Sequence, residues 1–178
     1  MSFSDTDLIT RVLLDDDRNA FGELVRRYQS EVRHFLRRLT KMDISRADDL
    51  SQETFIKAYR SISKFRGRAK FSSWLYRIAH NTFLNDCRKR RELLTSEGEF
   101  DHFADESIRL PKGLVSDVDD ALSQLELGER AVFDLYYRKG MTHSETAEAL
   151  ELPLGTVKTH LSRGKEKLRT LLKDWKTD

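Results

Sequence analysis

The sequence predicts an all-α protein made of two small helical domains joined by a flexible linker. Apolar residues recur at steps of three and four along most of the chain, as they do on the buried face of a helix. No stretch shows the two-residue alternation that is typical of a strand. Residues 93–115 lose the helical period in an acidic segment with two glycines and a proline, which indicates a linker. We therefore expect domains at residues 1–92 and 116–178.

Two amphipathic helices are predicted to open the first domain. The shorter one covers residues 7–14, ends at three consecutive aspartates, and should turn four side chains inward: Leu8, Ile9, Val12 and Leu13. The longer one follows from Phe21 to Leu39, where apolar residues repeat at helical spacing over about five turns.

A third helix is predicted over residues 45–62, with Ser45 as its N-cap. Its inward stripe consists of small and apolar residues: Ala47, Leu50, Thr54, Ala58 and Ile62. Its opposite face is acidic and carries one exposed aliphatic side chain; its members are Asp48, Asp49, Gln52, Glu53 and Ile56. Such a face suits a docking surface, although composition alone favours an ordinary solvated face.

A segment of cations and aromatic rings separates this helix from the next. Around Gly67 it places two phenylalanines and four cations: Lys64, Phe65, Arg66, Arg68, Lys70 and Phe71. A fourth helix should follow, capped by Ser72 or Ser73, with an apolar stripe that begins at Trp74. The surface of that helix carries Asn81, Asn85 and Arg88. Cations that hold phosphates beside rings and amides that contact bases are typical of single-stranded nucleic acid binding. The alternative is that the rings pack in the core, which we favour for Trp74.

The second domain is predicted to end in a helix-turn-helix over residues 142–169. Thr142 and Glu145 have the spacing of a capping box, and Pro153 forces a turn before the last helix. That helix has an apolar stripe and an outer face rich in cations and hydroxyls: Thr156, Lys158, Thr159, Ser162, Arg163 and Lys165. Such a helix fits the major groove of DNA. Glu151 stands where many of these motifs have glycine, and a helical hairpin with a solvated charged face is the alternative.

Charge is segregated along the chain, although the net charge is only +2. Residues 57–91 carry 11 Lys and Arg against Asp86 alone. Residues 154–178 carry 7 Lys and Arg against 3 acidic residues, and an acidic block at 92–153 lies between the two. Two basic blocks of this kind predict two contacts with a polyanion.

The sequence shows no recognisable catalytic motif and no recognisable metal-binding motif. Cys87 is the only cysteine, and the five histidines lack ligand spacing, so we expect neither a metal nor another cofactor. We find no phosphate-cradling glycine loop, HExxH motif or nucleophile elbow, and we name no catalytic residue. The N-terminus does not read as a signal peptide, and no apolar run approaches the ~20 residues of a membrane span. We expect a cytoplasmic protein without membrane insertion.

Three motifs, in this order and spacing, resemble the extracytoplasmic-function sigma factors of the sigma-70 family. They are AFGELVRRY at residues 20–28, ADDLSQETFIKAYRSISKFRGRAKFSSWLYRIAHNT at 47–82, and GTVKTHLSRGKEKLR at 155–169. The resemblance covers nearly the whole chain. The middle motif is very specific, whereas LuxR-type regulators have a closing motif that is nearly the same.

This resemblance implies a sigma-2 domain, a sigma-4 domain and no enzyme activity. It implies that the acidic face of the third helix docks on the beta-prime clamp helices of core RNA polymerase. It also implies that the protein contacts the beta subunit of the polymerase. The loop at 65–71 and the helix after it would open and read the −10 promoter element, and the helix at 156–165 would read the −35 element. Family members are often held inactive by an anti-sigma factor.

The rival interpretation is a helix-turn-helix transcription regulator that binds duplex DNA only. In that case the N-terminal half would serve dimerisation or sensing. An RNA-binding adaptor is a weaker third possibility. The cationic aromatic loop beside an acidic helix face separates these interpretations, because a plain regulator has no use for either.

Overall fold

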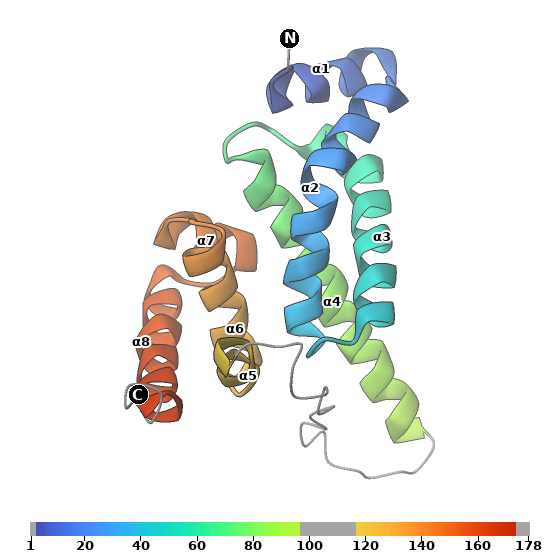
Figure 1. The fold of residues 1–178 in the computed structure, drawn as a ribbon. Coiled ribbons are helices and arrows are strands. Elements are labelled where there is room, and N and C mark those ends of the chain that lie inside the picture. Colours follow the sequence, from blue (N-terminus) through green and yellow to red (C-terminus); the bar gives the residue numbers. More distant parts are fainter. Residues whose placement is uncertain (1–2, 97–116, 174–178) are drawn as a thin grey trace. The chain divides into compact units, whose positions relative to one another are not determined.

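Every secondary-structure element in the described residues is helical (Figure 1). The computed structural model describes residues 3–96 and 117–173, and these form two compact units. The elements are α1 (Asp5–Asp15), α2 (Arg18–Leu39), α3 (Ile44–Ser61), the short turn η1 (Ile62–Lys64), α4 (Phe71–Ser96), α5 (Asp117–Ser123), α6 (Leu127–Phe133), the π-turn η2 (Asp134–Arg138), α7 (His143–Leu150) and α8 (Leu154–Leu171). Helix α4 includes the first four residues of the expected linker, and the rest of that linker lies outside the described residues.

Helix α2 is the central element of the first unit and packs against both α1 and α3. Most of its apolar stripe is buried as predicted, whereas Val25 and Tyr28 are only partly buried. Phe35 meets Tyr76 of α4 edge-on, with ring centroids 5.3 Å apart. The predicted stripe of α3 is also confirmed, because its five members are all buried. Apolar periodicity therefore predicted the inward faces of both long helices correctly.

The prediction for Leu13 is wrong, since this side chain is 45% exposed. Helix α1 has only 11 residues and buries a narrow face formed by Leu8, Ile9 and Val12. Successive residues are about 100° apart around a helix, which places Leu13 at the edge of that face.

Two predicted N-caps are also wrong. Asp43 caps α3 by accepting a hydrogen bond from the Arg46 N–H at 3.0 Å, so Ser45 lies inside the first turn. Helix α4 begins at Phe71, because the Trp74 N–H already bonds to the Lys70 carbonyl. Ser72 and Ser73 are therefore helical residues. In both places several residues could serve as caps, and the path of the preceding turn decided between them.

Apolar spacing in the sequence predicts one helix over residues 127–139 with Gly140 as its stop, and the second unit departs from this prediction. The α-helix stops at Phe133 and a π-turn continues to Arg138, closed by the Lys139 N–H on the Asp134 carbonyl. Gly140 ends the element with φ of 64°, as the sequence predicted, because glycine adopts this left-handed conformation without strain. Of the apolar residues expected to face inward on this stretch, Ala131, Val132 and Leu135 are buried, whereas Tyr136 is only partly buried.

Helices α6 and α8 cross closely at Gly164. A Cβ atom placed there would lie 2.4 Å from Cε2 of Phe133, which is far inside van der Waals contact. We expect Gly164→Ala to lower the free energy of unfolding by about 1–3 kcal/mol, because an overpacked core must shift. Urea unfolding measures this loss. Gly155→Ala is the matched control in the same helix, since its Cβ would meet nothing within 4 Å. Equal stability of the two variants would show that the crossing is looser than described.

Candidate nucleic-acid interfaces

Helix α8 presents the outer face that the sequence predicted. Its inward stripe is anchored by Val157 and Leu161, which are 0% and 5% exposed. On the other side Thr156 is partly exposed, and the remaining predicted residues are exposed: Lys158, Thr159, Ser162, Arg163 and Lys165. The Thr159 hydroxyl donates to the Gly155 carbonyl at 2.9 Å and keeps its lone pairs as acceptors. The face can therefore offer charge and hydrogen bonds to a DNA groove.

The turn before α8 has the geometry of a helix-turn-helix. The capping box of α7 is confirmed, because the Thr142 N–H donates to the Glu145 carboxylate and the Glu145 N–H donates to the Thr142 hydroxyl. Glu151 has φ of 54°, the left-handed conformation that explains why glycine is common at this position. The helical spacing of the sequence predicts that Ala147 and Leu150 both face inward; Leu150 is buried, whereas Ala147 is only partly buried. Thr146 and Ala149 are both 0% exposed and are the most deeply buried residues of α7.

Tyr137 is a neighbour of the outer face of α8 that sequence analysis missed. The Lys165 ammonium lies 5.6 Å from the centroid of the Tyr137 ring. A hydrogen bond with the Tyr137 side chain raises the pKa of Lys165, so the ammonium remains charged. Tyr137 reaches this place because the π-turn redirects the end of α6, and no sequence period signals such a turn.

The segment from Lys64, the last residue of η1, to Phe71, the first residue of α4, carries the four predicted cations and both phenylalanines, and is called the loop below. The loop cations Lys64, Arg66, Arg68 and Lys70 are exposed, and Gly67 turns the backbone with φ of 66°. Phe65 is partly exposed and lies 5.7 Å from Phe71 and 5.5 Å from Trp74, between ring centroids. Trp74 is buried, as we favoured.

The prediction that Phe71 presents its ring to bases does not hold in this structure. Phe71 is only 4% exposed, and its ring packs edge-on against Tyr28 at 5.5 Å. The helix begins at Phe71 itself, so this residue belongs to the buried stripe, and its ring contacts the Phe65 ring edge-on. Phe65 is the ring of the loop that remains available at the surface.

A pocket of about 470 Å³ opens beside this loop. One side is formed by α1, through Asp5, Thr6, Ile9 and Thr10, and Tyr28 of α2 closes the back. The opposite side is formed by the loop and the start of α4: Phe65, Gly67, Ala69, Lys70, Phe71 and Ser72. The pocket is therefore lined by aromatic rings, by the glycine turn of the loop and by a lysine. Sequence analysis did not predict a pocket here.

Helix α4 carries the three polar residues expected to contact nucleic acid. Asn81 is partly exposed, whereas Asn85 and Arg88 are exposed. Asn81 and Asn85 are four residues apart on one continuous helix, so they lie one turn from each other on the same side.

The acidic face of α3 divides into a structural part and a solvent-facing part. Asp48 lies 3.3 Å from both Arg33 and Arg37 of α2, so this carboxylate joins the two helices. Glu53 pairs with Lys57 at 2.7 Å, one turn along the same helix. Asp49 and Gln52 are exposed, and Ile56 is 51% exposed, so these three can meet a partner without breaking a contact of the fold.

Within the described ranges, no three His, Cys, Asp or Glu side chains gather closely enough to hold a metal ion. Every helix of the same ranges is too short or too polar to cross a lipid bilayer.

Two families match segments that together span most of the chain. The Sigma-70 region 2 family matches residues 24–92, and the Sigma-70, region 4 family matches residues 116–168. The first segment includes the acidic face of α3 and the cationic loop. The second includes the helix-turn-helix. Helix α1 lies outside both.

Curated relatives cover almost the full length. The chain is 36% identical to the ECF RNA polymerase sigma-E factor of Haemophilus influenzae, with 92% of each chain covered. It is 33% identical to the ECF RNA polymerase sigma factor SigW of Bacillus subtilis, which covers 89% of this chain and 91% of SigW.

Two solved structures share the fold along most of the chain. The sigma factor RpoE of Bartonella quintana, solved in complex with the anti-sigma factor NepR, matches with a TM-score of 0.70 and 29% identity over 86% of this chain and 96% of RpoE. CnrH, solved in complex with the cytosolic domain of CnrY, matches with a TM-score of 0.70 and 25% identity over 96% of this chain and 97% of CnrH.

Proposed function

This chain belongs to the extracytoplasmic-function sigma factors of the sigma-70 family, a family of transcription initiation factors. From this premise we propose which surface binds the polymerase and which surfaces bind promoter DNA. The acidic face of α3 docks on the beta-prime clamp helices of core RNA polymerase, whose beta subunit offers a further contact. The loop and α4 open and read the −10 element, and α8 reads the −35 element. The protein acts in the cytoplasm and has no catalytic activity of its own.

One observation supports this division: four exposed cations flank the partly exposed Phe65 in the segment 64–70, beside a pocket. Strand opening without ATP requires binding energy that only separated strands receive. Extruding a base costs a few kcal/mol, and stacking on an aromatic ring returns about 1–3 kcal/mol per base. The cations hold the phosphates of the strand at the same time. A duplex-only regulator gains nothing from this arrangement.

The domain boundaries that we propose remain those of the sequence, at residues 1–92 and 116–178 with the linker between them. An anti-sigma factor is a further proposed partner, because RpoE of Bartonella quintana is solved in complex with one. A surface that docks on polymerase is a natural place for such an inhibitor to compete, and the exposed Asp49, Gln52 and Ile56 are candidates for that contact.

The choice of strand separates this function from the rival regulator. We expect the full chain, bound to core polymerase, to bind the single non-template −10 strand more tightly than the same sequence as a duplex. Fluorescence anisotropy with labelled oligonucleotides measures both affinities. A regulator would bind its duplex without polymerase and would ignore the single strand. That result would overturn the proposal.

Arg163 tests the −35 assignment. Its guanidinium is exposed on the outer face of α8 and matches the paired acceptors of a guanine edge. We expect Arg163→Ala to cost about 1–3 kcal/mol of binding free energy at one promoter position and little elsewhere. Affinities for a set of −35 variants at several salt concentrations measure this. A loss that is equal on all sequences, with a smaller salt slope, would show that Arg163 contacts only a phosphate.

A further inference from the structure

One lysine of α8 reaches back to α6. The Lys167 ammonium lies 2.9 Å from the Glu129 carboxylate and 3.0 Å from the Glu126 carboxylate, both at the start of α6. A lysine ammonium carries three hydrogens, and two of them are spent on these contacts. Lys167 belongs to the second basic block of the sequence, but its charge is used within the fold.

Glu129 is the buried end of this contact. Its side chain is 1% exposed, and a carboxylate removed from water is costly unless charges and hydrogen bonds compensate it. The Glu126 N–H donates to the same oxygen, Oε2, at 3.1 Å, as part of the capping box of α6. Lys167 therefore binds a carboxylate whose position is already fixed by the first turn of α6.

Arg163 is the neighbour of Lys167 on the surface of α8. The two are four residues apart on one continuous helix, so they lie one turn from each other on the same side. The hydrogen bond from Lys167 is the main cause that lowers the pKa of Glu126, and the nearby charge of Arg163 lowers it further. Arg163 therefore lies within electrostatic reach of the carboxylates that hold Lys167, although its side chain is exposed.

Two kinds of partner compete for the Arg163 guanidinium. A carboxylate and a guanine edge both present paired acceptors, and arginine binds either of them through two parallel hydrogen bonds. Pairing with Glu126 or Glu129 would turn the guanidinium away from the outer face of α8. Lys167 already occupies both carboxylates, and the hydrogen bonds to Glu129 and Glu126 raise the pKa of Lys167, so its ammonium stays charged.

Building on the proposed −35 role of α8, we propose that Lys167 is a positioning residue for −35 readout. It occupies Glu126 and Glu129 and thereby leaves Arg163 free to read a base. Lys167 itself contacts no phosphate, and its charge acts on DNA only through Arg163. The close crossing at Gly164 keeps α6 and α8 together when Lys167 is changed, so its loss should redirect Arg163 without separating the helices.

Lys167→Met tests this role in the full chain bound to core polymerase. Fluorescence anisotropy measures its affinity for −35 duplexes that carry single base changes, at several salt concentrations. We expect discrimination to fall on the order of tenfold at the one position that Arg163→Ala also affects, which is the loss of one good base contact. Affinity for the changed duplexes and the salt slope should stay the same. In the Arg163→Ala background, Lys167→Met should have no further effect.

Three further variants separate this role from a phosphate contact and from a loss of stability. Lys167→Arg keeps the charge and should keep the discrimination. Glu126→Gln and Glu129→Gln, added together to Lys167→Met, remove both charges that attract Arg163, so the discrimination should return. Arg169→Met removes an exposed cation two residues further along α8 and should leave the discrimination unchanged.

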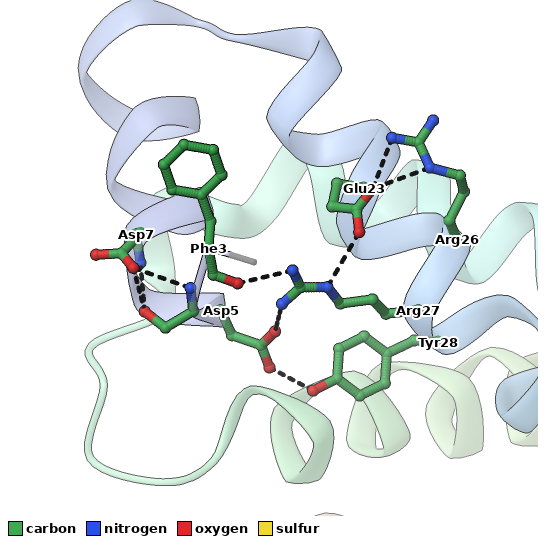
Figure 2. A network of polar contacts seen from close by, with 8 residues as sticks. Phe3, Asp5, Asp7, Glu23, Arg26, Arg27 and Tyr28 are labelled. Carbon is green, nitrogen blue, oxygen red and sulfur yellow. Dashed lines mark hydrogen bonds and ion pairs between the residues drawn. The ribbon is translucent and has the colours of Figure 1, made fainter. Parts of the chain in front are cut away.

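Arg27 offers a control for stability in the first unit (Figure 2). Its guanidinium joins two carboxylates, as Lys167 does: Asp5 of α1 at 2.9 Å and Glu23 of α2 at 3.3 Å. The Tyr28 hydroxyl donates to the same Asp5 carboxylate, as Figure 2 shows. Arg27→Met should lower the free energy of unfolding, measured with urea, and should leave the −35 discrimination unchanged.

Each other outcome counts against a specific part of this account. Unchanged discrimination in Lys167→Met would overturn the positioning role. An equal loss on every duplex, with a smaller salt slope, would show that Lys167 contacts a phosphate. Discrimination that stays lost after both glutamates are neutralised would show that Lys167 only stabilises the fold. If the wild-type complex does not distinguish −35 duplexes at all, the proposed function of α8 itself fails.

Discussion

Asp49→Arg is expected to weaken binding to core RNA polymerase by several kcal/mol and to leave the fold intact. The side chain of Asp49 is exposed on α3. A charge reversal at a complementary interface places like charges together, which is costly. Pull-down or anisotropy with labelled protein measures the polymerase affinity, and circular dichroism measures helical content.

Two comparisons keep this result specific to docking. Asp15→Arg reverses an exposed carboxylate at the end of α1 and should leave polymerase affinity unchanged. Asp48→Arg should lower stability as well as affinity, because Asp48 pairs with Arg33 and Arg37 of α2. A native Asp49→Arg protein with undiminished polymerase affinity would remove this face from the interface.

Asn81→Ala is expected to reduce open-complex formation with little effect on polymerase affinity. Asn81 and Asn85 lie one turn apart on α4, where their amides can bond base edges of the same strand. 2-Aminopurine placed in the −10 region reports the unstacking of that strand. Gln29→Ala removes an exposed amide from α2 and serves as the control. A full fluorescence signal from the Asn81→Ala protein would exclude Asn81 from the site.

The helical spacing of apolar residues predicted the long helices and the faces that they bury, because each helix carries its own buried stripe. This spacing was less informative about the residues at which the helices begin and end. Ser45 and Ser72 are good capping residues, but α3 begins after Asp43 and α4 begins at Phe71. The turn before each helix decides its first residue. The same shift moved Phe71 from an expected surface for bases into the core.

The candidate site divides in a similar way. The outer face of α8 and the cations of the loop were predictable, since exposure on a helix follows from the position of its buried stripe. The pocket was not predictable, because it depends on Arg27 and Tyr28 bringing α1 back to the loop across long sequence separations. Tyr137 was missed because the π-turn that carries it to Lys165 has no periodic signature.

Run-off transcription tests the central claim most directly. Core RNA polymerase alone should start without regard to sequence on a linear template that carries the promoter of this protein. With the protein added, we expect a single transcript that starts downstream of a defined −35 and −10 pair, and mutation of either element should abolish it. The Asp49→Arg protein should restore the pattern of core polymerase alone. Unchanged, sequence-independent initiation in the presence of the wild-type protein would contradict the account.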